Sequence, residues 1–245
     1  MQIILTIKTS STAFLLIASL LIGILSPLSS EIALGKNFKR SQPRRNQTET
    51  PKAAPSASDR NTSTSVDEWL SDERIIFISG EIAPEMAESV IAQLLYLDSQ
   101  APGKDIYLYI NSSGGDITAG LSMYDTMRAL RSNVVTVSLG EASSMASLLL
   151  AGGTRGKRLA LPNSRIMIHQ PLGGTWGQAS EVAIATKEIL YLRSVLNRLL
   201  AESTGQPLKR IEVDTDRDFY LSAEQAKAYG IIDKVINKLP SASRP

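Results

Sequence analysis

The sequence contains no cysteine and only one histidine, His169, among its 245 residues. The absence of cysteine excludes disulfide bonds, a thiol nucleophile and a metal site built on thiolates. With one histidine, a zinc site made of several imidazoles is excluded as well. Any catalytic base of the imidazole type must therefore be His169.

The sequence also has little net charge, since 26 Lys and Arg nearly balance 24 Asp and Glu, and the small basic excess is unevenly placed. Residues 1–65 carry eight basic and three acidic side chains, whereas the rest carry 18 and 21. The basic character thus belongs to the N-terminal segment, and the folded part gives no reason to expect nucleic-acid binding.

The N-terminal 65 residues have the composition of a leader rather than of a fold. An uncharged apolar run at 13–25 is short for a membrane span and suits the apolar region of a signal peptide. Residues 36–65 are basic, rich in Ser, Thr and Pro, and are predicted to be disordered. We interpret 1–65 as a targeting leader or as an anchor with its linker. We expect a soluble compartment, either the cytoplasm or, if 1–65 is a cleaved leader, an organelle stroma of the plastid type. An uncleaved anchor would instead attach the protein to a membrane through 13–25.

Residues 66–245 are predicted to form one α/β domain. Apolar and β-branched runs alternate with segments of helical periodicity, and glycine-rich turns follow several of the runs. This succession indicates repeated strand-turn-helix units with a largely parallel sheet. The predicted strands are 74–80, 105–110, 133–140, 158–161, 165–170 and 231–236, and the predicted helices are 84–100, 117–131, a segment within 139–153, 179–202 and 222–230, the last opened by a Ser222–Gln225 capping box.

Two glycine-rich junctions, 111–116 and 139–146, are candidates for chemistry because helix N-termini present backbone amides to negative charge. The second contains Ser143, Ser144 and Ser147. Serines in such a place are often helix caps or small packing residues, and a nucleophile would need His169 as its base. The acid that orients the imidazole could be Asp214, Asp216 or Asp218, and spacing alone does not choose among them.

Longer stretches of the sequence identify a protein family more specifically than these single residues do. The segments "DIYLYINSSGGDITAGLSMYDTM", "GEASSMASLLLAGGTRGKRLALPNSRIMIHQPLGG" and "GQPLKRIEVDTDRDFYLSAEQAKAYGIIDKVI" resemble the Clp proteolytic-subunit family of serine peptidases, ClpP, almost continuously from residue 73 to 237. The resemblance implies the fold that this family shares with the crotonases, with a protruding long helix and a hairpin at 171–178.

Carried over by residue, the resemblance implies a catalytic triad and an oxyanion hole. The nucleophile falls on Ser144, the base on His169 and the orienting acid on Asp218, while the oxyanion amides fall on Gly115 and Met145. Where the family commonly has proline, this chain has Ser113. The implied substrate-binding residues lie in the glycine-rich stretch before the long helix: Gly173, Gly174 and Thr175.

The resemblance further implies a serine endopeptidase that degrades unfolded polypeptides inside two stacked seven-subunit rings. An AAA+ unfoldase would use the ATP, and the chain itself would need no cofactor or metal. Two other functions stay open: a non-catalytic subunit of a mixed Clp ring, and a crotonase-like acyl-CoA enzyme.

Overall fold

The computed structural model describes residues 65–240 of the chain. The predicted leader, with its apolar run at 13–25, lies outside the described residues, and so do residues 241–245. The domain boundary at 65/66 therefore stays a prediction. Within the described part of the chain, no helix combines the length and apolar character needed to cross a membrane.

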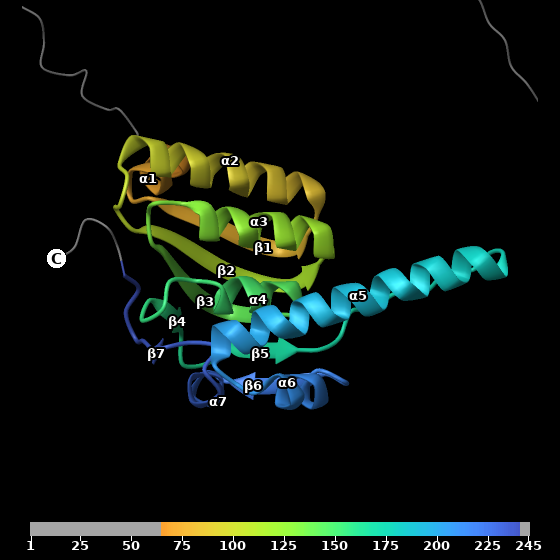
Figure 1. Ribbon diagram of the computed structural model, residues 1–245. Coiled ribbons are helices and arrows are strands. Elements are labelled where there is room, and N and C mark those ends of the chain that lie inside the picture. The colour runs from red at the N-terminus through yellow and green to blue at the C-terminus, as the bar shows by residue number, and fades with distance from the viewer. Residues whose placement is uncertain (1–64, 241–245) are drawn as a thin grey trace, which may run out of the picture. The chain divides into compact units, whose positions relative to one another are not determined.

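A repeated strand-helix unit builds the sheet, and the predicted α/β fold is confirmed. Parallel crossovers have one handedness, so strands added in chain order leave their helices on one face. Figure 1 shows α2, α3 and α4 together over that face. The sheet order is β1-β2-β3-β4-β7 with all these pairs parallel, and the elements are β1 (Ile75–Ile82), α2 (Pro84–Gln100), β2 (Ile106–Gly115), α3 (Ile117–Ala129), β3 (Val134–Ser143), α4 (Met145–Ala151), β4 (Arg158–Ala160) and β7 (Lys234–Val235).

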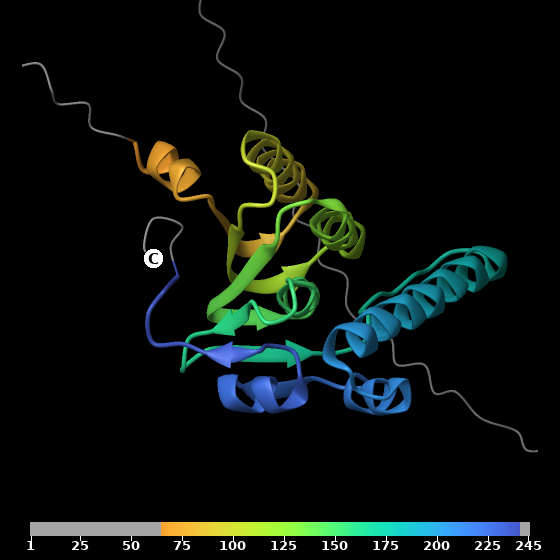
Figure 2. The ribbon, with the colours of Figure 1, turned by 60° about the vertical axis from the view of Figure 1, so that its left-hand side comes forward.

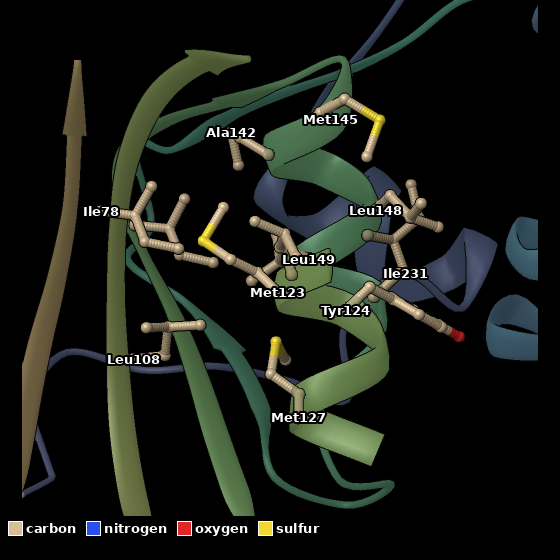
Figure 3. Packing of buried hydrophobic residues seen from close by; sticks show 14 of the residues in the cluster. Ile78, Leu108, Met123, Tyr124, Met127, Ala142, Met145, Leu148, Leu149 and Ile231 are labelled. Atoms are coloured by element: carbon tan, nitrogen blue, oxygen red, sulfur yellow. The ribbon is translucent and has the colours of Figure 1, made fainter. Parts of the chain in front are cut away.

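The main core lies between the sheet and these helices. Figure 3 shows side chains of the sheet, such as Ile78 and Leu108, gathered with Met123 of α3 and Leu149 of α4. All seven residues of α4 are buried, which is typical of a helix that lies wholly in the interior. The opposite face of the sheet carries a smaller cluster, to which α1 (Val66–Asp72) contributes Leu70.

The sheet forks at β3. Its first half, Thr136–Ser138, pairs with β4, whereas Glu141–Ser143 pair with β5 (Arg165–Ile168). On its other side β5 pairs antiparallel with β6 (Phe219–Ser222). The end of β5 therefore lies between the end of β3 and the start of β6.

The longest helix, α5 (Ala179–Thr204), projects away from the sheet in both ribbon views (Figures 1 and 2). Its 26 residues span about 39 Å, yet only Leu196, Asn197 and Leu200 are buried. The connecting segment 169–178 runs back beside it, and a Cβ on Gly173 would lie 2.9 Å from Ile189 Cδ1. We call residues 171–191 the arm. The remaining helices are α6 (Leu208–Asp214) and α7 (Ala223–Tyr229).

Several local predictions differ from the structure. The hairpin predicted at 171–178 has no strand pairing within the described chain, so the projection consists of a helix and an extended segment. The turn predicted at 111–116 continues β2 as far as Gly115. The strand predicted at 231–236 is reduced to β7, because the chain there first leaves the αL cap at Gly230 (φ 97°). The capping box of Ser222 and Gln225 is present as predicted.

Candidate active site

Strand register alone brings three predicted site residues together. Parallel pairing of β3 with β5 sets Ser143 beside Met167, and Ser144 donates its backbone N–H to Met167 O at 2.9 Å. Antiparallel pairing sets Ile168 opposite Phe219, so the next positions outward are His169 and Asp218. Three strand ends thus meet at one point of the sheet.

The side chains at this point form a continuous hydrogen-bonded chain. His169 Nε2 lies 2.9 Å from Ser144 Oγ, and His169 Nδ1 lies 3.0 Å from Asp218 Oδ1. With the proton on Nδ1, the imidazole donates to the carboxylate and accepts from the serine hydroxyl. The His169 side chain is only 11% exposed, whereas that of Asp218 is 56% exposed. The geometry is that of a serine nucleophile, a base and an orienting acid.

Ser144 has a backbone conformation that serine rarely adopts, with φ 56° and ψ −125°. It stands between the last residue of β3 and the first residue of α4, in a sharp strand-to-helix turn. Such conformations cost about 1–3 kcal/mol and persist where the surroundings hold them. Here the restraints are the bond from Ser144 N to Met167 O and the bonds that Ser147 donates to Ser144 O. This backbone conformation places the Ser144 hydroxyl within hydrogen-bond distance of His169.

The glycine-rich end of β2 packs directly on this turn. A Cβ on Gly114 (φ 95°) would lie 2.6 Å from Ser144 Cβ and 3.1 Å from Met145 N. A Cβ on Gly115 would overlap Ile82 O of β1. The Ser112 hydroxyl accepts a hydrogen bond from Gly114 N at 3.1 Å and holds the loop. The backbone of two separate elements therefore approaches Ser144, as a two-amide oxyanion hole requires.

The other candidates have different partners. Ser143 donates to Glu141 Oε1 at 2.6 Å, and Ser147 donates to Ser144 O at 2.6 Å, so neither hydroxyl is engaged with His169. Of the three candidate acids, Asp214 accepts hydrogen bonds from Tyr229 and Arg210, and Asp216 pairs with Arg193. Only Asp218 reaches His169, and this choice was left open by the sequence.

A pocket of about 270 Å³ opens beside Ser144. One side is the glycine loop and the triad residues Ser144 and His169, and the rest is mainly apolar. Sequence reasoning missed its α5 wall, because the apolar residues of a long helix do not show which of them face a pocket and which face a partner. It also missed Glu81, since an acidic residue at a strand end carries no signal of its own. The lining side chains away from the triad include Glu81, Ile117, Leu148, Ile168, Leu172, Leu196 and Leu200.

A sequence model of the Clp protease family matches residues 58–239. The ATP-dependent Clp protease proteolytic subunit 1 of Gloeobacter violaceus is 57% identical over 171 residues, which cover 70% of this chain and 87% of that protein. The chain belongs to the Clp protease family. It is accordingly a serine endopeptidase, and the crotonase-like acyl-CoA enzyme is set aside.

Two further expectations drawn from the Clp family concern residues around the triad. Ser113, at a position where Clp members commonly carry proline, lines the pocket, and the bond between Ser112 and Gly114 keeps the loop in place without it. Of the implied substrate-binding residues, Gly173 borders a second hollow with His169 and Asp216–Asp218. Gly174 and Thr175 are exposed on the arm and line neither hollow.

Among residues 65–240, no group of three or more His, Asp or Glu side chains is arranged to hold a metal ion.

Proposed function

We propose that this chain hydrolyses peptide bonds by acyl transfer through Ser144. The observation that carries the proposal is the hydrogen-bonded chain Asp218–His169–Ser144 at the edge of an apolar pocket. Such a chain activates a hydroxyl that is a weak nucleophile by itself.

In the first half of the reaction His169 Nε2 takes the Ser144 proton as Oγ attacks the peptide carbonyl. The backbone amides of Gly115 and Met145 hold the oxyanion of the tetrahedral intermediate, and His169 then protonates the leaving amine. Water hydrolyses the acyl-enzyme with His169 again as the base. Asp218 remains ionised and keeps the imidazole proton on Nδ1.

The proposed substrates are unfolded polypeptides that bind in extended form. An apolar side chain next to the scissile bond would enter the pocket between Leu148, Leu196 and Leu200. The backbone of Gly173, Gly174 and Thr175, which pairs with no strand within the described chain, would add hydrogen bonds to the peptide backbone.

The arm supports the proposal that the chain assembles with copies of itself as two stacked seven-membered rings. Trp176 is 92% exposed, and Leu172, Ile184, Leu190 and Tyr191 are also exposed, an apolar surface that monomeric proteins rarely present. We further propose that a Clp-type AAA+ ATPase delivers the polypeptide and uses the ATP, while this chain needs no cofactor and binds no nucleic acid. The assembly would work in a soluble compartment.

A serine-directed fluorophosphonate probe tests the proposed nucleophile. The wild-type assembly should be labelled, Ser144→Ala should not, and Ser143→Ala should be labelled normally because the Ser143 hydroxyl bonds Glu141. An assembled wild type that takes no label and cleaves no peptide would instead support the non-catalytic ring subunit.

A further inference from the structure

One carboxylate at the active-site pocket has no assigned role. Glu81 lies near the end of β1, where its Cα pairs with Gly114 across the ladder. Gly114 in turn packs against Ser144 Cβ, so only one residue separates Glu81 from the proposed nucleophile. The side chain is exposed and lines the pocket together with Gly115, Ser144 and His169.

Glu81 differs from the other acidic residues around the site in being unpaired. Asp218 bonds His169, Asp216 pairs with Arg193 and Arg217, and Glu141 accepts from Ser143. Within residues 65–240, no hydrogen bond or ion pair engages the Glu81 carboxylate. None of the described residues that line the pocket is a Lys or an Arg. The pocket therefore carries one free negative charge beside apolar walls.

A basic side chain matches both of these properties. The methylene stem of Lys or Arg packs on apolar surface while its charged end reaches a polar partner. The walls formed by Ile117 and Leu148 would receive the stem, and the Glu81 carboxylate would receive the cation. A second acidic group brought to the same place would be repelled.

We propose that Glu81 is a specificity-determining residue that favours substrates with a Lys or Arg side chain at one position next to the scissile bond. The inference rests on the proposed peptidase function. Because Glu81 is exposed, the pair with the substrate is partly screened, and we expect a preference of about two- to fivefold over a neutral side chain of the same length. The preference falls as salt is added.

The test uses the assembled protein and fluorogenic peptides that are identical except at one residue. That residue is Lys, norleucine or Glu, and it is moved in turn through the positions flanking the scissile bond. The measured quantity is the Lys-to-norleucine ratio of kcat/KM within one enzyme sample, in which the fraction of active enzyme cancels. Glu81→Gln and Glu81→Lys are compared with Glu88→Gln, which removes an exposed carboxylate of α2 away from the pocket.

At one position we expect wild type and Glu88→Gln to prefer Lys, Glu81→Gln to show a ratio near one, and Glu81→Lys to prefer Glu. If the charge of Glu81 acted only on His169, the variants would change kcat/KM by the same factor for every peptide. The Lys-to-norleucine ratio of kcat/KM would then stay constant, which overturns the inference. An unchanged Lys preference in Glu81→Gln also overturns it, while the peptidase function stands. Absence of both hydrolysis and fluorophosphonate labelling in wild type overturns the two together.

Discussion

Apolar residues are buried in one region of the domain and exposed in another: the body, which is residues 65–170 and 192–240, and the arm. In the body, α4 and the strands around it are almost completely buried, and Leu149 and Leu150 have no exposed surface. On the arm, Trp176 is 92% and Ile184 is 70% exposed. The apolar stripe of α5 has the same period as that of a core helix, yet only three residues of α5 are buried. Hydrophobic periodicity therefore shows that a surface becomes covered, but not whether the same chain covers it.

The body and the arm also have different parts in the proposed function. The three residues of the proposed triad lie at strand ends of the body, so their geometry is a property of one folded chain. Substrate backbone pairing and ring assembly are assigned to the arm, which pairs with no strand within the described residues. Matched changes in the two regions should therefore affect different measurements.

The largest contrast is expected from two glycines. Gly114→Ala places a Cβ against Ser144 at a residue with φ 95°, which displaces the nucleophile and the adjacent Met145 amide. We expect kcat to fall by about 100- to 1000-fold, as for the loss of an oxyanion donor. Gly174→Ala on the arm meets no atom within 4 Å and keeps the backbone groups proposed to bind the peptide, so it should change kcat less than twofold. Equal losses in both variants would contradict the assignment of the site to the body.

Truncating an aliphatic side chain should lower the free energy of unfolding much more in the body than on the arm. Leu149→Ala leaves a cavity in the core and should lower the free energy of unfolding by about 3 kcal/mol. Leu149→Met keeps the volume and should cost less than about 1.5 kcal/mol. Ile184→Ala on the arm should cost less than about 0.5 kcal/mol. Urea denaturation followed by circular dichroism measures the free energy of unfolding of all three variants. A cost for Ile184→Ala as large as that for Leu149→Ala would show that the arm belongs to the cooperative unit.

An ion pair in the body should make stability depend on pH. Burial would raise the pKa of Asp233, but hydrogen bonds from the Arg158 guanidinium and backbone outweigh it and hold that pKa below its ordinary value of 3.8. Since the folded pKa is the lower one, the stabilisation is present above about pH 4 and is lost as the pH falls through the folded pKa.

Asp233→Asn should therefore cost about 2 kcal/mol near pH 7 and flatten the acid limb of the stability profile. Beside the arm, Asp216→Asn removes an exposed pair with Arg193 and should cost at most about 1 kcal/mol. Thermal unfolding between pH 3 and pH 7 measures both variants. An acid limb in Asp233→Asn as steep as that of wild type would refute the proposed source of the pH dependence.

The smallest effect on stability is expected from the most exposed side chains of the arm. Replacing Trp176 and Ile184 together by Gln should change subunit stability by less than about 0.5 kcal/mol. The same change should shift sedimentation toward smaller assemblies, because the arm loses apolar surface for a partner to cover. Unaltered sedimentation would remove the arm from the proposed interface.

Much of the fold follows from local signals in the sequence. The β-branched run of β3, the proline-opened helix α2 and the capping box of Ser222 each specify their element without help from distant residues. The short elements α1, α6 and β6 were not predicted. The helix α6 has only seven residues, which is too short for helical periodicity to identify it. The four residues of β6 are defined only by pairing with β5.

In the site, too, some features follow from the local sequence and others depend on pairing between distant segments. Ser144, His169 and Asp218 were named from the family resemblance, and the residues alone left Asp214 and Asp216 equally eligible. The register of β6 against β5 decides among them, and register between distant segments is not visible in spacing along the chain. The continuation of β2 through 111–115 was missed for a related reason. Glycine normally indicates a turn, but here the partners on both sides maintain the strand.

The φ of 56° at Ser144 implies a trade between activity and stability. Glycine lacks the Cβ that makes this conformation costly, so a change of Ser144 to glycine would relieve backbone strain and remove the hydroxyl at the same time. In a copy of this chain that no longer needed catalysis, replacement of Ser144 by glycine would relieve that strain, whereas replacement by alanine would keep it. At the proposed nucleophile, the backbone preference of the residue and the demand for a hydroxyl thus oppose each other.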